Sequence, residues 1–157
     1  MRLFQNKFSL VFIFLFSLPI VAQDVDKESK LIQDINVILS NSIGATTYSV
    51  SVSDDNLIVN CGYNQTFPMD KIDVEKIKII KESMQINNQG RKGNLYYLKL
   101  FDNQKGNYVY NESFSKKVNV LIIVYSHEQE ETIKNLKNLF VELVNNHLGL
   151  KKNLNPN

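Results

Sequence analysis

The sequence predicts an α+β domain: an antiparallel sheet or partly open barrel of five to six strands, with an N-terminal helix and a C-terminal amphipathic helix. Three observations predict it. Apolar residues recur at helical spacing near both ends of the chain, they alternate with polar residues over the middle, and short polar turns separate the alternating runs. Helices segregated from an antiparallel sheet are typical of the α+β class.

Residues 1–22 differ from the rest of the chain. Arg2 and Lys7 precede an apolar run at 8–20, and acidic sequence begins soon after Ala22. A basic start, a short apolar run and a small residue before the cleavage point are the parts of a secretory signal peptide. We expect cleavage after Ala22, with an uncleaved membrane anchor as the alternative. The protein is then exported, to the periplasm of a bacterium or outside the cell.

Residues 23–157 are expected to form a single α+β domain. Without the two cations of the signal peptide, basic and acidic residues are equal in number, so the charge does not indicate nucleic acid as a partner. One Cys excludes a disulfide scaffold and a Cys-rich metal fold.

The first helix is expected over residues 24–43. Leu31, Ile35 and Leu39 recur at helical spacing with polar residues between them. Gly44 is expected to end this helix, because glycine favours the backbone conformation that follows a helix.

A β-hairpin is expected next, centred on an Asp-Asp-Asn turn at 54–56. Apolar residues alternate with polar ones on both sides of the turn, and they are Tyr48, Val50, Val52, Leu57, Val59 and Cys61. Residues 62–69 are expected to form a loop.

The apolar residues of 72–79 change parity near Glu75 and Lys76, which predicts a strand with a bulge. A short helix is the alternative. Polar residues at 87–94 predict a turn, and a strand that is apolar on both faces follows at 95–101.

A short strand at 108–110 and an apolar strand at 118–125 complete the sheet, and the second is expected to be central and covered on both faces. Ser126 and Gln129 predict a capping box at the start of the last helix, and Gly149 its end. The apolar stripe of this helix consists of Ile133, Leu136, Leu139, Phe140, Leu143, Val144 and Leu148.

We expect no catalytic residue, no cofactor and no metal site. The sequence has no zinc-protease, nucleophile-elbow or phosphate-loop motif. His127 and His147 are about 30 Å apart along a helix and cannot share a metal. Cys61 is in phase with the core. The carboxylates at 70–75 alternate with lysines, as on a solvated strand face.

Tyrosines gather in the second half of the predicted sheet. Core packing accounts for them, unless one face of the sheet is left uncovered for a ligand or partner. The candidate interaction surface consists of Tyr96, Tyr97, Tyr108 and Tyr110.

A run of antiparallel strands closed by one amphipathic C-terminal helix, over about residues 45–149, resembles the pleckstrin-homology-like barrel. The segment at 67–77, Phe-Pro-Met-Asp-Lys-Ile-Asp-Val-Glu-Lys-Ile, is similar to a stretch in short exported bacterial proteins of unknown function. Lipid-binding members of that superfamily place basic residues in the first hairpin turn, which is acidic here. The resemblance therefore does not imply phosphoinositide binding.

These observations predict a non-enzymatic, exported binding or protein-interaction module. Its unknown protein partner is expected on an exposed sheet edge or on the tyrosine surface. The alternative is a periplasmic carrier of a small apolar ligand or lipid inside a partly open barrel. An enzyme of unrecognised type is the third hypothesis. Membrane contact is expected only through residues 1–22, if they are not cleaved.

Overall fold

The computed structural model describes residues 26–44, 46–88, 91–103 and 106–154 of the chain. The predicted signal peptide lies outside the described residues. Among the helices that are described, none is long and apolar enough to cross a membrane.

Two helices and eight strands make up the described residues. The first helix spans residues 26–40, and α2 spans Glu130–Leu154. The strands are β1 (Ser49–Ser53), β2 (Asn56–Asn60), β3 (Asn64–Pro68), β4 (Lys78–Asn88), β5 (Arg91–Phe101), β6 (Val109–Asn111), β7 (Lys116–Val118) and β8 (Val120–His127). Single-turn 3-10 helices connect some of them, at η1 (Met69–Lys71), η2 (Val74–Lys76) and η3 (Glu112–Phe114).

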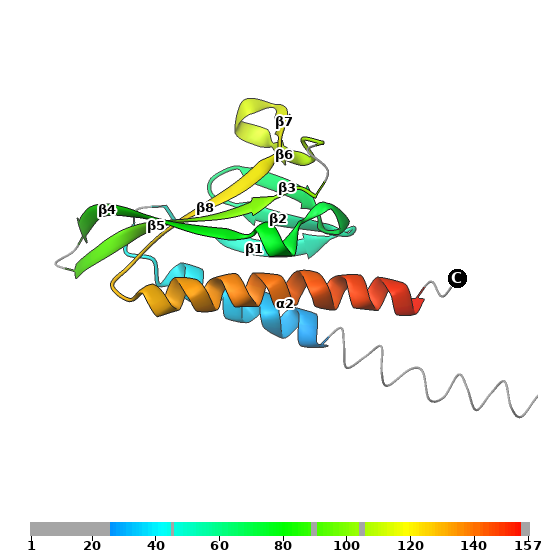
Figure 1. Cartoon of the computed structure of the whole chain (residues 1–157), viewed down its shortest axis with the longest axis horizontal. Helices are drawn as coiled ribbons and strands as arrows, with labels where there is room; N and C mark the ends of the chain where they lie inside the picture. The colour runs from blue at the N-terminus through cyan, green and yellow to red at the C-terminus, as the bar shows by residue number, and fades with distance from the viewer. Residues whose placement is uncertain (1–25, 45, 89–90, 104–105, 155–157) are drawn as a thin grey trace, which may run out of the picture.

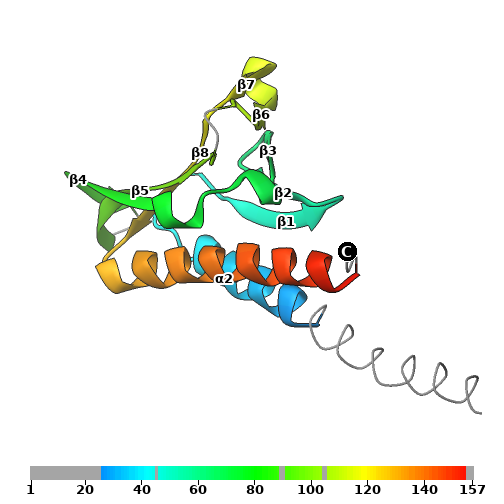
Figure 2. The same ribbon diagram turned by 45° about the vertical axis from the view of Figure 1, so that its right-hand side comes forward.

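The strands form two antiparallel sheets, which lie on one side of a layer of two helices (Figures 1 and 2). One sheet has the order β1-β2-β3-β6-β7, and the other has the order β4-β5-β8. The helix at 26–40 runs beside α2, so neither helix covers the opposite face of the sheets. The predicted α+β class and both terminal helices are confirmed, whereas a single sheet of five to six strands is wrong.

The β1–β2 hairpin is confirmed, and its turn explains the two aspartates. Asp54 and Asp55 have φ values of 49° and 64°, as a two-residue type I′ turn requires, and Asp tolerates this region better than most residues. The outer edge of β1 is covered by the first helix. The Asn36 amide donates to the Val50 carbonyl at 2.9 Å and accepts from the Val50 N–H at 2.7 Å, as a neighbouring strand would.

The stretch between this hairpin and β5 differs from the prediction. The expected loop at 62–69 contains β3, and the expected bulge near Glu75 is the 3-10 turn η2. The Asp73 carboxylate stabilises that turn, because it accepts from the Glu75 and Lys76 N–H groups at 3.2 and 3.3 Å. The register shift in the sheet falls later, between Glu82 and Gln85, and β4 and β5 extend into the predicted turn at 87–94.

The start and the end of α2 were also predicted wrongly. Ser126 still belongs to β8, so the capping box does not form, and the Gln129 N–H donates instead to Nδ1 of His127 at 3.1 Å. The helix passes Gly149, where an added Cβ would meet nothing within 4 Å. A glycine inside a helix costs only about 1 kcal/mol, which is too little to end one that is packed along its length.

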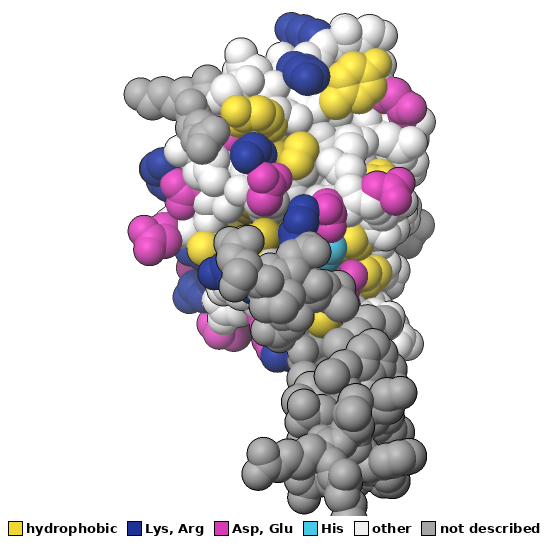
Figure 3. Space-filling model, turned by 90° about the vertical axis from the view of Figure 1, so that its right-hand side faces the viewer, with side chains coloured by type: hydrophobic (Ala, Val, Ile, Leu, Met, Phe, Trp, Pro, Cys, Tyr) yellow, Lys and Arg dark blue, Asp and Glu magenta, His cyan; other side chains and the backbone are white. Residues whose placement is uncertain are grey.

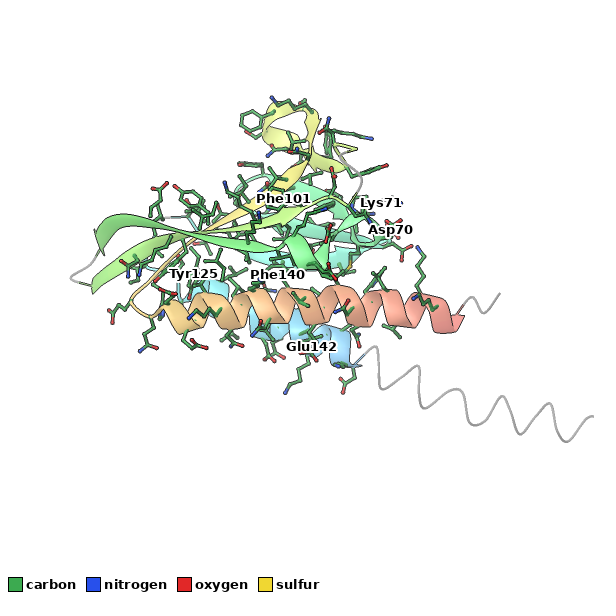
Figure 4. All side chains as sticks on the ribbon, in the orientation of Figure 1. Asp70, Lys71, Phe101, Tyr125, Phe140 and Glu142 are labelled. Carbon is green, nitrogen blue, oxygen red and sulfur yellow. The ribbon has the colours of Figure 1, made fainter. Side chains whose placement is uncertain are left out.

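The core lies between the sheets and the helices. Its completely buried members from α2 are Ile133, Leu136, Phe140, Leu143 and Val144, which confirms most of the predicted stripe. Tyr125 and Phe140 lie between β8 and α2, whereas Phe101 lies on the far side of the sheet (Figure 4). An ion pair of 2.9 Å between Lys27 and Glu142 joins the two helices. Cys61 is half-buried and packs against the core, as its phase predicts.

Candidate functional site

A pocket of about 330 Å³ lies at the border of this core, between β8 and the five-stranded sheet. One wall consists of Val120, Ile122 and Val124. These side chains alternate with Leu121, Ile123 and Tyr125, which are completely buried in the core. Since successive side chains of a strand point to opposite faces, the pocket is lined by the face of β8 opposite to Leu121, Ile123 and Tyr125.

The facing wall is a row of three polar side chains, which we call the donor row: Gln65, Asn111 and Lys116. They line the same pocket. Gln65 of β3 is the register partner of Asn111 in β6, and Asn111 is the partner of Lys116 in β7. Directly opposed residues of adjacent strands share one face of a sheet, so three separate strands place these groups side by side.

Aromatic side chains border the pocket. They are Tyr48, Tyr63 and Phe114. Phe114 is 63% exposed, although it is a large apolar side chain, and it is held at the end of η3. Its N–H donates to the Asn111 side-chain oxygen at 3.4 Å, and the next residue, Ser115, has a φ of 49°.

Burial contributes to raised pKa values of the two phenols that border the pocket. It is the main cause that raises the pKa of Tyr48. The pKa of Tyr63 is raised first by a hydrogen bond with Cys61 and then by burial. Both phenols therefore keep their protons at neutral pH.

The four tyrosines predicted as an interaction surface do not lie together. Tyr96 and Tyr97 are neighbours on β5 and point to opposite faces. Tyr96 is completely buried, so its place on a surface is wrong. Its hydroxyl and that of Tyr125 have no hydrogen-bond partner among the described residues. The two tyrosines are register partners in β5 and β8, beneath the helices.

The other three tyrosines lie nearer to the surface. Tyr97 is the register partner of Val124 and shares its face of the sheet, so it adjoins the pocket. The Lys71 ammonium lies 5.7 Å from the ring centre of the half-buried Tyr108. Tyr110 is 41% exposed and points to the face opposite Asn111.

The sequence analysis does not predict the grouping of Gln65, Asn111 and Lys116 in the donor row. Gln65 lies in a stretch with few apolar residues, which therefore reads as a loop. One signal was present: Phe67 and Met69 follow Gln65 with a period of two, and all three are buried. The pairing of Asn111 with Gln65 joins residues that are far apart in the chain, and no local pattern encodes such a register.

A second cluster surrounds His147 at the far end of α2. Its Nδ1 lies 2.8 Å from a carboxylate oxygen of Glu28, in the first helix, and its Nε2 lies 3.1 Å from one of Asp55, in the β1–β2 turn. Lys151 also binds Asp55. Figure 3 shows this end of the molecule, where acidic and basic side chains surround a histidine.

This cluster joins three elements by charge. A neutral imidazole carries one N–H and can donate to one carboxylate, whereas an imidazolium can donate to both. The hydrogen bonds from Lys151 and His147 hold the pKa of Asp55 below its ordinary value. Among the described residues, no group of three or more His, Cys, Asp and Glu side chains is placed to hold a metal ion.

Comparisons with protein-family models, with curated proteins and with solved structures give no match to this chain. Any functional conclusion therefore rests on the pocket and on the surfaces around it.

Proposed function

We propose that this protein is an exported, non-enzymatic binding module that takes a small, mainly apolar ligand in the pocket between β8 and the donor row. One observation carries this proposal. The core between the sheets and the helices is packed, with its central side chains completely buried, and the pocket of about 330 Å³ lies at its border. The half-buried apolar wall of β8 thus borders a space large enough for a small ligand.

The lining supports binding more than catalysis. It offers aliphatic side chains, aromatic rings, two amides and one ammonium group. Ligand pockets typically combine a mainly apolar lining with a few polar groups that orient the ligand. Gln65 and Asn111 are 5% and 6% exposed, so the packing around them fixes where their amides lie.

Export is the cellular part of this proposal. The basic start, apolar run and small residue of 1–22 support a cleaved signal peptide and a periplasmic or secreted location. A pleckstrin-homology-like identity also stays a proposal. Two antiparallel sheets and a C-terminal helix support it, whereas the first helix is an addition to that pattern.

Docking of a protein partner is the second candidate function. Phe114 and Tyr110 are 63% and 41% exposed and lie within five residues of each other in the chain. The two edges of the five-stranded sheet are less suitable sites, since Asn36 covers β1 and β7 is short and carries Lys116 and Lys117.

The proposed function is tested with 1-octanol as an uncharged probe. We expect saturable amide chemical-shift changes in a ¹⁵N-labelled sample, clustered at Ile122, Val124, Gln65 and Asn111. Replacing Ile122 by Trp should fill the pocket and abolish these changes. Val37→Trp is the control, because Val37 is exposed on the first helix.

Thermal unfolding of each variant shows whether it has folded. If Ile122→Trp does not fold, Val124→Trp replaces it. Octanol-induced changes that are absent, or spread over the whole surface, would contradict a binding pocket here. Changes confined to Tyr110, which points to the face opposite Asn111, would favour the docking of a protein partner.

A further inference from the structure

The donor row extends a continuous line of side chains across the five-stranded sheet. Register pairs connect Val50 to Val59, Val59 to Gln65, Gln65 to Asn111, and Asn111 to Lys116. Along this line the side chains change from buried and apolar, through buried amides, to an exposed ammonium group. Polarity and positive charge therefore increase from the core toward one end of the pocket.

The two amides are oriented by the protein itself. The Gln65 amide nitrogen lies 3.5 Å from the Ile122 carbonyl, so it connects the donor row to β8. The Asn111 side-chain oxygen accepts from Phe114 N–H. Lys116 ends the row, with its ammonium nitrogen 5.4 Å from the centre of the Phe114 ring.

Among the residues that the structure describes, the pocket lining contains one cation and no carboxylate. Glu112 is the nearest acidic residue in the chain to this cation, and its carboxylate accepts from the Asn64 N–H at 2.7 Å. Lys117, the neighbour of Lys116, points to the other face of β7. The ligand complementary to this lining carries a single negative charge at one end and an apolar body.

The volume restricts the size of that body. Ligand pockets typically measure about 300–1,000 Å³, and this one, at about 330 Å³, is at the lower end. It fits a medium-length acyl chain or a single aromatic ring better than a long-chain lipid.

We propose that the ligand is a small apolar monocarboxylate, whose carboxylate is bound at Lys116 and the adjoining amide of Asn111 and whose body lies against Val120, Ile122 and Val124. This inference rests on the proposed function and specifies its ligand class. A charge-assisted hydrogen bond to this exposed lysine favours the acid over an uncharged analogue of the same length.

The test compares octanoate with 1-octanol at pH 7 by amide shift titration of the full protein. We expect octanoate to bind about fivefold more tightly, which is the ratio that an ion pair of about 1 kcal/mol gives. Lys116→Gln should remove this preference, so that octanoate and octanol bind to this variant with the same affinity. Lys117→Gln should keep the preference, because it removes the same charge from the opposite face. Raising the salt concentration should reduce the preference.

The outcomes separate this inference from the proposed function. Octanol binding with no preference for octanoate, or a preference equally reduced by Lys116→Gln and Lys117→Gln, would overturn the carboxylate site and leave the pocket in place. If neither probe binds, both proposals fail.

Discussion

The two faces of β8 have similar sequences and different surroundings. Leu121, Ile123 and Tyr125 on one face are completely buried between the sheets and the helices. Val120, Ile122 and Val124 on the other face are half-buried and line an open pocket. An apolar strand face thus indicates that other groups pack against it. It does not indicate whether those groups belong to the same chain or to a bound molecule. On the pocket face, we infer, the cover is a ligand.

The largest expected effect is a difference in unfolding free energy between Ile123→Ala and Ile122→Ala, two identical changes at adjacent positions. Ile123→Ala leaves a cavity in the packed core, and we expect a loss of about 2–5 kcal/mol in the free energy of unfolding. Ile122 is half-buried beside open space, and we expect a loss of about 1 kcal/mol. Urea denaturation followed by circular dichroism measures both. Equal losses would show that the two faces are packed alike.

The second prediction concerns the stability at high pH that Tyr125 contributes, on the core face of β8. Burial raises the pKa of Tyr125 to about 12. The unfolded chain loses this proton from about pH 10, so stability falls between these values, by up to about 1.4 kcal/mol per pH unit. Tyr125→Phe should lack this contribution, and at neutral pH it should be no less stable, because the lost hydroxyl has no described partner.

Unfolding free energies of both proteins between pH 8 and 12, at about one-unit steps, check this prediction. Lysines titrate in the same range and affect the two proteins equally, so the difference between the curves isolates Tyr125. Parallel curves would mean that water reaches the phenol.

Much of the fold follows from local patterns. The alternation from Tyr48 to Cys61 and the Asp-Asp-Asn turn predict the first hairpin, and the stripe from Ile133 to Leu148 predicts α2. The apolar run at 118–125 predicts a central strand that is covered on both faces. The strand forms, but both details are wrong, because β8 is the last strand of its sheet and both helices lie on the same side of the sheets. Layer arrangement is a tertiary property that no single element encodes.

The pocket was less predictable than the fold. Asn111 and Lys116 follow the end of a short predicted strand, and their sequence is typical of a polar loop. Only the register with Gln65 places them side by side in the pocket. Residue type alone groups the four tyrosines, whereas the structure separates Tyr96 from the others because β5 turns it into the core. Residue type indicates an interaction surface only where the face of each strand is known.

The smallest expected effect concerns the bonds that hold α2 against the β1–β2 turn. Asp55 binds His147 and Lys151 of α2, and these bonds lower its pKa from 3.8. A lowered pKa contributes stability above the ordinary carboxyl value, and the contribution is lost as the pH falls through the folded-state pKa. Asp55→Asn should therefore lower the thermal unfolding midpoint slightly at pH 7, and the difference from the native protein should vanish in acid.

Asp54→Asn is the matched control, since it removes the neighbouring charge of the same turn and leaves the bonds to α2 in place. Thermal scans across the acidic range measure both variants. Equal losses of thermal stability at pH 7 would mean that the negative charge of the turn determines the effect. The cluster around His147 would then not hold α2 in place.

The most direct measurement records nuclear Overhauser effects between bound octanoate and the methyl groups of β8. We predict contacts from the ligand chain to Val120, Ile122 and Val124, and none to Leu121 or Ile123. Contacts to Leu121 and Ile123 would place the ligand within the core and contradict a binding site on the open face of the strand.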